Sequence, residues 1–338
     1  MVPRLLLAAL LGLIVTAALA TTNPDDDLVF DDTPLSEPLT LPDWFKVSFL
    51  DLRDDLKEAV AAGKRGIILY FGQERCPYCK AHLQNNWGKK DIVDYTRKYF
   101  DVIAIDVRGQ KTVVGLDGDE YTEKEFAIKY KTNFTPSLVF IDRRGQMVLR
   151  LRGYRPPYQF RAALEYVADA HYREESFADY LARAEGASSY GKDVLNQEDF
   201  FQPPPYNLDR SRIPGQRPLV VFFERRRCHA CDVLHAGPLA DPRIRKHMVQ
   251  LDAVQLDMQA DIPVITPSSQ RTTARKWAEA LALDYAPTLI FFDERGKEIM
   301  RIDSVVWFYR LNNVLTYILD KGYTQFPTFQ AWRQHHGR

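Results

Sequence analysis

The sequence predicts an α/β protein with two tandem domains, each a central mixed β-sheet flanked by helices. Short apolar segments typical of buried strands alternate with amphipathic segments typical of helices. This order of segments occurs twice, and a Cys-x-x-Cys motif stands at the same place in each copy, at Cys76 to Cys79 and at Cys228 to Cys231. These four residues are the only cysteines in the chain.

Fixed landmarks indicate that the two copies are repeats of one domain. Cys76 precedes Pro136, and Cys228 precedes Pro287, by nearly the same length of chain. The sequences that follow the two prolines also correspond, with Phe-Ile-Asp-Arg-Arg-Gly at 140–145 and Phe-Phe-Asp-Glu-Arg-Gly at 291–296.

The first copy reads as a regular series of helices and strands. Gly63 suits the C-terminal cap of a first helix, and Asp117-Gly118 is a hairpin signal. Thr122 and Glu125 form a capping-box pattern that starts another helix. We expect helices at 49–62, from Cys76 onward, at 91–100, 122–131 and 159–172, and strands at 66–71, 102–107, 138–142 and 146–152, with a hairpin at 113–121.

The second copy keeps this order but departs from it in places. The segment 261–270 lacks the hairpin signal of the first copy, and Val305-Val306-Trp307 stands where the first copy has Gly153-Tyr154. We expect strands at 218–223, 253–257, 288–293 and 297–303, and helices at 231–236, 273–283 and 308–321.

The N-terminus indicates export. Met1 to Arg4 is a short basic region, residues 5–16 are apolar, and Ala18 to Ala20 resembles a small-residue cleavage site. We expect a signal peptide at 1–20 that is cleaved after Ala20, which places the mature chain in the periplasm, an oxidising compartment. The apolar run is shorter than the about 20 residues that span a bilayer, so no membrane span is expected in the mature chain.

The remaining boundaries follow from composition. Lys and Arg together number 45, as do Asp and Glu, so the charge balance gives no reason to expect a nucleic-acid partner. We divide the mature chain into a flexible acidic lead-in at 21–43, a first domain at 44–185, a linker at 186–217, a second domain at 218–325 and a C-terminal tail at 326–338.

The spacing of the cysteines favours redox chemistry over structural bridging. A disulfide across two intervening residues closes almost no loop in the unfolded chain, so it adds little stability. A cysteine at a helix N-terminus lies near unpaired backbone N–H groups that favour the thiolate. We therefore assign Cys76 and Cys228 as nucleophiles, and Cys79 and Cys231 as the resolving thiols that attack a mixed disulfide.

The combination of strand, Cys-x-x-Cys helix and later strand-leading proline resembles the thioredoxin superfamily. The first domain looks most similar to periplasmic thioredoxin-like proteins of the SoxW type, through Tyr70-Phe71-Gly72, the Cys76 motif, residues 135–140 and Arg152-Gly153-Tyr154. The resemblance implies thioredoxin-like domains that exchange disulfides without a cofactor. It also implies a substrate-binding role for the backbone at Thr135, Pro136, Ala286 and Pro287, with both prolines cis.

The implied substrates are proteins or small molecules that contain disulfides, and the implied electron partner is a membrane or periplasmic thiol. The chain also departs from the family pattern. The buried aspartate that thioredoxins carry six residues before the first cysteine is replaced by Tyr70 and Phe222. Proton transfer would then use water or a neighbour such as Glu74 or Glu224, although we favour a surface position for each of these glutamates.

The residues around the two pairs differ in charge. Pro77 and Tyr78 separate the first pair and carry no charge, whereas Arg227 and His229 flank the second nucleophile. Cationic neighbours lower a thiol pKa and stabilise the reduced form. We assign these four residues as modulators of the cysteine pKa, and expect the second pair to have the higher reduction potential.

Two alternatives concern the second domain. Cys228, His229, Cys231 and His235 have the chemistry of copper or zinc ligands, although we favour His235 as a helix-surface residue and assign no metal. The domain could instead bind substrate without catalysing exchange. His335 and His336 are expected in a frayed C-terminus.

Overall fold

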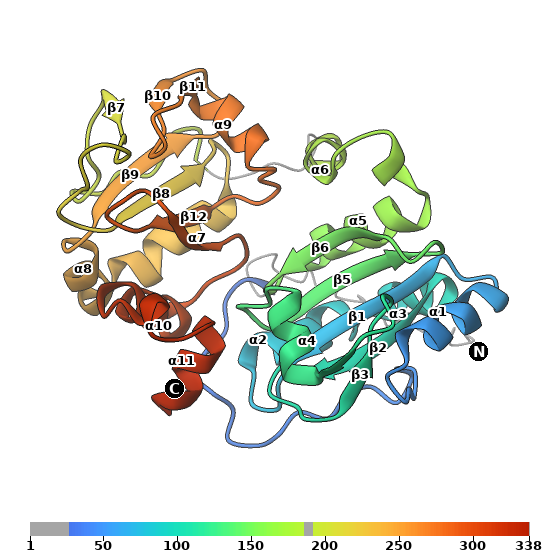
Figure 1. Ribbon diagram of the computed structural model, residues 1–338. Helices are drawn as coiled ribbons and strands as arrows, with labels where there is room; N and C mark the ends of the chain where they lie inside the picture. Colours follow the sequence, from blue (N-terminus) through green and yellow to red (C-terminus); the bar gives the residue numbers. More distant parts are fainter. Residues whose placement is uncertain (1–26, 186–191, 338) are drawn as a thin grey trace, which may run out of the picture.

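A computed structural model describes residues 27–185 and 192–337 of the chain (Figure 1). The expected signal peptide and its cleavage site lie outside the described residues. In the described part of the chain, no helix combines the length and the apolar character needed to cross a bilayer.

The first domain is built on a four-stranded mixed sheet. Its central strand β1 (Gly66–Gly72) is buried along its whole length, as its apolar sequence predicts. It pairs in parallel with β2 (Phe100–Asp106) and antiparallel with β5 (Ser137–Asp142). β6 (Met147–Arg152) completes the order β2-β1-β5-β6.

The second domain repeats this sheet strand for strand. β8 (Leu219–Glu224) is parallel to β9 (Asp252–Asp257) and antiparallel to β12 (Thr288–Phe292). β13 (Glu298–Ile302) lies at the far edge, so the order β9-β8-β12-β13 matches the first domain. The predicted duplication of an α/β domain is therefore confirmed.

Helices cover both faces of the first sheet (Figure 1). α1 (Leu52–Ala61) and α4 (Glu123–Lys129) pack on one face, and α4 begins with the predicted capping box. The other face carries α2 (Pro77–Ala81), α3 (Lys90–Tyr99) and α5 (Pro157–Ala168). α2 continues into a π-helical turn at His82–Asn86, and α6 (Phe177–Glu185) follows α5.

The second sheet is covered less evenly. One face packs against α7 (His229–Ala236), α8 (Pro242–Met248) and α10 (Phe308–Leu319), and α11 (Phe329–His335) packs on α10 and joins the same apolar cluster. The other face carries α9 (Ala274–Ala280) and Leu208 from the connection between the domains.

A hairpin is present in the second domain where its absence was predicted. β10 (Pro263–Ile265) pairs antiparallel with β11 (Arg271–Thr273), like β3 (Thr112–Val114) and β4 (Glu120–Thr122) in the first domain. The turn lacks glycine, but Ser269 takes the left-handed conformation with a φ of 68° and the Thr266 hydroxyl accepts from the Gln270 N–H. The connection between the domains adds β7 (Tyr206–Asn207) beside β10.

The lead-in and the tail are ordered where they are described, unlike our expectation. Leu28 is buried in the core of the first domain, and Asp32 is buried against the second. At the other end, Phe329 and Trp332 of α11 are buried in the core of the second domain. The acidic and polar composition of both segments concealed these few anchoring side chains.

The two domains meet through corresponding loops. Leu151 pairs with Leu138 in the first sheet, and Ile302 pairs with Leu289 in the second. The residues that follow Leu151 and Ile302, which are Arg152 and Asp303, therefore occupy matching positions in the two domains. These two residues form an ion pair of 2.5 Å across the interface. The next positions also meet: a Cβ at Gly153 would collide with the Ser304 side chain, and the Val305 N–H donates to the Tyr154 carbonyl at 3.1 Å. The domains are therefore related by an approximate twofold axis at these loops.

Candidate active sites at the two cysteine pairs

Local sequence places the first cysteine pair at the start of α2. Cys76 is the N-cap of this helix, and its Sγ accepts from the Cys79 N–H at 3.0 Å, while Pro77 suits the first turn. The two cysteines are joined by a disulfide. The Thr135–Pro136 peptide is cis, and Cys76 Sγ lies 3.2 Å from the Thr135 hydroxyl. The fold thus brings all of these predicted site residues together.

The second pair has the same arrangement at the start of α7. Cys228 is the N-cap, its Sγ accepts from the Cys231 N–H at 3.1 Å, and the two cysteines form a disulfide. The Ala286–Pro287 peptide is cis, and Cys228 Sγ lies 3.5 Å from the Ala286 carbonyl oxygen. The matched geometry agrees with the predicted cis prolines in both copies.

The second domain covers the first site. Arg310 of α10 donates through Nη2 to the Thr135 carbonyl at 2.8 Å, and its guanidinium lies 3.3 Å from the centre of the Tyr78 ring. Burial lowers the pKa of Arg310 to about 10, which still leaves it charged at neutral pH. Cys76 is 1% exposed. The carbonyl expected to pair with substrate is thus already occupied.

The lead-in closes the same site from another side. Asp32 accepts from the Tyr78 hydroxyl at 2.7 Å and from the backbone N–H groups of Tyr309 and Arg310 at 2.8 Å each. Burial, together with the charge of Asp32, raises the pKa of the Tyr78 phenol well above its usual value. Tyr78 therefore acts in the structure as an anchor between the two domains, a role that its motif does not reveal.

The charges near the second pair are balanced by carboxylates. Arg227 forms an ion pair of 3.1 Å with Asp193, and its side chain is more than half exposed. Arg226 lies 3.7 Å from Asp257 and is similarly exposed. Because exposed and paired charges act weakly at a distance, the expected influence of Arg227 and of the half-buried His229 on Cys228 stays a prediction.

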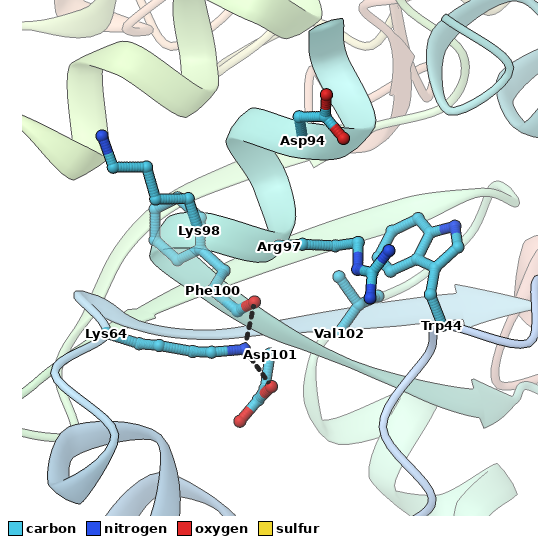
Figure 2. Close-up of a pocket in the computed structure, with 8 residues that line it drawn as sticks. All are labelled: Trp44, Lys64, Asp94, Arg97, Lys98, Phe100, Asp101 and Val102. Atoms are coloured by element: carbon cyan, nitrogen blue, oxygen red, sulfur yellow. Dashed lines mark hydrogen bonds and ion pairs between the residues drawn. The ribbon is translucent and has the colours of Figure 1, made fainter. Parts of the chain in front are cut away.

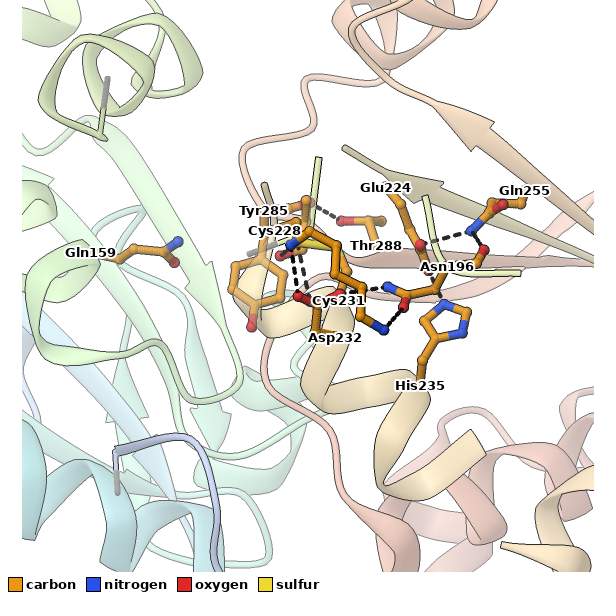
Figure 3. Close-up of a disulfide and its surroundings, with 12 residues drawn as sticks. Gln159, Asn196, Glu224, Cys228, Cys231, Asp232, His235, Gln255, Tyr285 and Thr288 are labelled. Atoms are coloured by element: carbon orange, nitrogen blue, oxygen red, sulfur yellow. Dashed lines mark hydrogen bonds and ion pairs between the residues drawn. A yellow bond between two sulfur atoms is a disulfide. The ribbon is translucent and has the colours of Figure 1, made fainter. Parts of the chain in front are cut away.

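His235 is buried, and our prediction of a helix-surface residue is wrong. Its Nε2 lies 2.9 Å from Glu224, which is fully buried (Figure 3). Its Nδ1 lies 2.9 Å from Glu198. Burial alone would lower the pKa of His235, but the hydrogen bonds and charges of these two carboxylates raise it above its ordinary value. Glu224 is the last residue of β8, so the surface position that we favoured for it is also wrong. A carboxylate at the end of an apolar strand was the available sequence signal.

The network around His235 continues through Gln255, whose Nε2 donates to Glu224 at 2.9 Å.

The first domain, among its described residues, has no matching charged network at the corresponding positions. His82 lies on the face of the sheet that α2 covers, and burial lowers its pKa to about 3, so it is neutral. Tyr70 and Phe222, at the positions of the thioredoxin aspartate, are both buried and supply no carboxylate. The two pairs thus have unlike charged surroundings.

The described residues offer no ligand set for the copper or zinc ion considered above. Both ring nitrogens of His235 face carboxylates instead of the cysteine sulfurs. Among the residues that the structure describes, no three histidine, cysteine or acidic side chains are grouped so that they could hold a metal ion.

A pocket of about 390 Å³ lies in the first domain away from the predicted site residues (Figure 2). Lys64 donates to the Phe100 carbonyl at 3.2 Å and to Asp101 at 2.5 Å, so its charge is already engaged. The other lining residues are Trp44, Asp94, Arg97, Lys98 and Val102.

Comparisons with known proteins agree with this geometry. The sequence matches the thioredoxin-like domain family over residues 52–168 and again over 207–319. A search of curated proteins gave no match.

Several solved structures are similar over about one domain. A thioredoxin-fold protein from Helicobacter pylori is 26% identical, with 43% of this chain and 89% of that chain covered and a TM-score of 0.33. A DsbH oxidoreductase is 18% identical, with 39% and 91% covered and a TM-score of 0.28. A disulphide isomerase from Xylella fastidiosa is 19% identical, with 44% and 99% covered and a TM-score of 0.23.

The family assignment rests on the sequence match, which spans more than half of the chain, and on the sheet order that both halves share. Each half places a close cysteine pair at the start of a helix, opposite a proline that leads into a strand. The chain belongs to the thioredoxin-like domain family and contains that domain twice.

Proposed function

We propose that the protein is an exported thiol:disulfide oxidoreductase that reduces disulfides through its two Cys-x-x-Cys pairs. The observation that carries this proposal is the position of each nucleophile. Cys76 and Cys228 both cap a helix and accept a hydrogen bond from the N–H of the resolving cysteine. Such N–H groups and the positive end of the helix favour the thiolate over the thiol.

The exchange proceeds in two steps. The nucleophilic thiolate attacks one sulfur of the substrate disulfide, whose S–S bond breaks as a mixed disulfide forms and one substrate thiolate leaves. The resolving thiolate, Cys79 or Cys231, then attacks the nucleophilic sulfur and releases the second substrate thiolate. Two electrons pass to the substrate, and its thiolates take up protons from water. A thiol donor regenerates the reduced pair.

The basic and apolar N-terminal sequence supports export to the periplasm, with cleavage after Ala20. The resemblance of the cysteine motifs to those of thioredoxins and glutaredoxins supports the reducing direction, whereas a fully oxidising partner would make the same residues an oxidase or isomerase. Exchange at Cys76 requires the contact between Arg310 and Thr135 to open, since this contact covers the site.

The decisive experiment compares cysteine variants of the mature chain. Each protein is assayed for reduction of insulin and of hydroxyethyl disulfide with dithiothreitol as electron donor. We expect activity from the unaltered protein, from the Cys76→Ser/Cys79→Ser variant and from the Cys228→Ser/Cys231→Ser variant. The variant with all four substitutions is the control. An unaltered protein no faster than this control would contradict the proposed activity. Loss of all reductase activity in the Cys76→Ser/Cys79→Ser variant, but not in the Cys228→Ser/Cys231→Ser variant, would indicate that the second domain binds substrate without catalysing exchange.

Export is tested separately. Expression of the full chain in a bacterial host should yield periplasmic protein whose N-terminal residue is Thr21. Retention of residues 1–20 in the cytoplasmic fraction would contradict this part of the proposal.

A further inference from the structure

A second pocket lies beside Ala286, which neighbours the second cysteine pair, and both domains form its walls. Its volume is about 370 Å³, at the low end of the range in which pockets hold ligands. Gln159 of the first domain faces Tyr285 across the interface in Figure 3, and both residues line this pocket. The first domain also contributes Asp179 and Leu181, and the second also contributes Arg225, Arg275, Glu279 and Ala286.

The inner part of the pocket suits an extended peptide. Leu181, Leu283 and Tyr285 are buried apolar lining residues. Ala286 also lines the pocket, and no group among the described residues accepts from its backbone N–H. Its carbonyl lies beside Cys228 Sγ. A backbone N–H that bonds to no described group and lies next to an apolar surface suits pairing with a peptide strand.

The charges at the rim favour a basic side chain. Arg275 is paired with Asp261 at 3.3 Å, and Asp284 is paired with Arg155 at 2.8 Å. By contrast, Asp179 and Glu279 form no ion pair with any described residue, and both are exposed.

Arg225 also lines the pocket and is half-buried. The rim therefore carries charges of both signs, and two of its carboxylates have no cationic partner among the residues that the structure describes. These carboxylates come from opposite walls, Asp179 from the first domain and Glu279 from the second.

We infer that this pocket binds a polypeptide segment with a basic residue next to the cysteine that reacts with Cys228. The first domain thereby supplies part of the substrate site of the second. That the bound segment reacts through a cysteine rests on the proposed function. The preference for a basic residue is inferred only from the side chains that line the pocket.

Binding is measured with redox-inert peptides, so that the test does not depend on catalysis. A fluorescent ten-residue peptide carries Ser in place of cysteine and Lys beside it, and matched peptides carry Ala or Glu in place of Lys. We expect the Lys peptide to bind the oxidised mature chain more tightly than the Ala peptide, and the Glu peptide most weakly. The preference should weaken as salt is added, because the charges are exposed.

Substitutions on both walls test the assignment. Asp179→Asn and Glu279→Gln should each weaken binding of the Lys peptide by about threefold, with little effect on the Ala peptide. Glu174→Gln is the matched control, because Glu174 is exposed close to α6 but does not line the pocket. Equal binding of the three peptides, or an Asp179→Asn variant that behaves like Glu174→Gln, would overturn the inference.

Activity measurements separate this inference from the proposed function. In the Cys76→Ser/Cys79→Ser background, Asp179→Asn should lower kcat/KM for a Lys-flanked peptide disulfide and leave reduction of hydroxyethyl disulfide unchanged. A protein that reduces no disulfide but still prefers the Lys peptide would contradict the activity and support the binding site. An active protein without charge preference would refute the binding site alone.

Discussion

His235 lies in the last turn of α7, the helix that carries Cys231, and its buried imidazole is held between Glu198 and Glu224. Glu198 also contacts Arg245 at 2.7 Å, so the cluster contains charges of both signs. Since the pKa of His235 is raised in the folded state, its contribution to stability is fully present below the unfolded pKa of about 6.5. That contribution is lost as the pH rises through the folded pKa.

Replacement of this histidine should therefore cost stability in a pH-dependent way. We expect His235→Leu to reduce the free energy of unfolding by about 3 kcal/mol at pH 6, because Glu224 is left buried without its partner. The loss should be smaller at pH 9, because a group whose pKa is raised on folding contributes less stability as the pH rises above its unfolded pKa. Urea unfolding of both proteins at the two pH values measures this difference.

His171→Gln is the control, since His171 is partly exposed and lies 3.7 Å from Glu175. It should change the free energy of unfolding little at either pH. A cost of His235→Leu that is equal at pH 6 and pH 9 would mean that folding does not raise the pKa of His235.

At the residue scale, sequence reasoning succeeded where the chemistry is local. Cys76 and Cys79 lie one helical turn apart in the motif itself, and Pro136 follows at a spacing that both copies share. The role of His235 depends on Glu198, which is distant in sequence, and on its burial. Periodicity alone could not provide that information.

At the scale of elements, α10 depends on the lead-in for its N-terminal cap. Its own N-cap residue, Trp307, forms no side-chain capping bond. Asp32 instead accepts from the N–H groups of Tyr309 and Arg310, two of the donors that a helix start leaves unpaired. A carboxylate at this end also interacts favourably with the helix dipole.

Asp32→Ala should therefore destabilise the protein by about 1 to 2 kcal/mol, the usual cost of losing a cap. Asp32→Asn should lose less, because its side-chain oxygen can still accept a hydrogen bond. Asp31→Ala is the control, since Asp31 is exposed and bonds only to Thr33 among the described residues. Urea unfolding ranks the three variants, and equal losses for Asp32→Ala and Asp31→Ala would exclude a capping role.

Elements with a local signature were predicted well. The capping box of Thr122 and Glu125 and the Asp117-Gly118 hairpin both occur as expected. The hairpin around Ser269 was missed because a serine in the left-handed conformation has no strong sequence signal. The lead-in was missed because Asp32 is stabilised by a helix from the opposite end of the chain.

On the scale of the whole molecule, each domain inserts an aromatic residue into the other. Phe134 packs in the core of the second domain, 5.7 Å from Phe329 between ring centres. Tyr285 packs in the core of the first domain, where the Arg155 guanidinium lies 4.7 Å from its ring. Phe134 and Tyr285 occupy matching positions, two residues before the cis prolines, so the interface repeats the internal duplication.

This symmetry is broken at the cysteines. Arg310 and the lead-in cover the first site, whereas Ala286 at the second site lines an open pocket. Cys228 is 5% exposed against 1% for Cys76. A reagent therefore reaches Cys76 only after the domains move apart locally.

Alkylation of the fully reduced mature protein should reveal this difference. We expect Cys228 to react with iodoacetamide at least about tenfold faster than Cys76, which corresponds to about 1.4 kcal/mol of additional opening. Arg310→Ala should speed labelling of Cys76 and leave Cys228 unchanged, because Arg310 bonds to Thr135 at the first site. Mass spectrometry of tryptic peptides measures both rates in one sample.

The control for this substitution is Arg243→Ala, since Arg243 is exposed and contacts Phe308 of α10 without reaching the first domain. It should leave both rates unchanged. Equal labelling of Cys76 and Cys228 in the unaltered protein would show that the first site is open in solution. Faster labelling of both cysteines in Arg310→Ala would instead mean that Arg310 holds the whole interface together, because only a general separation of the domains exposes the two sites at once.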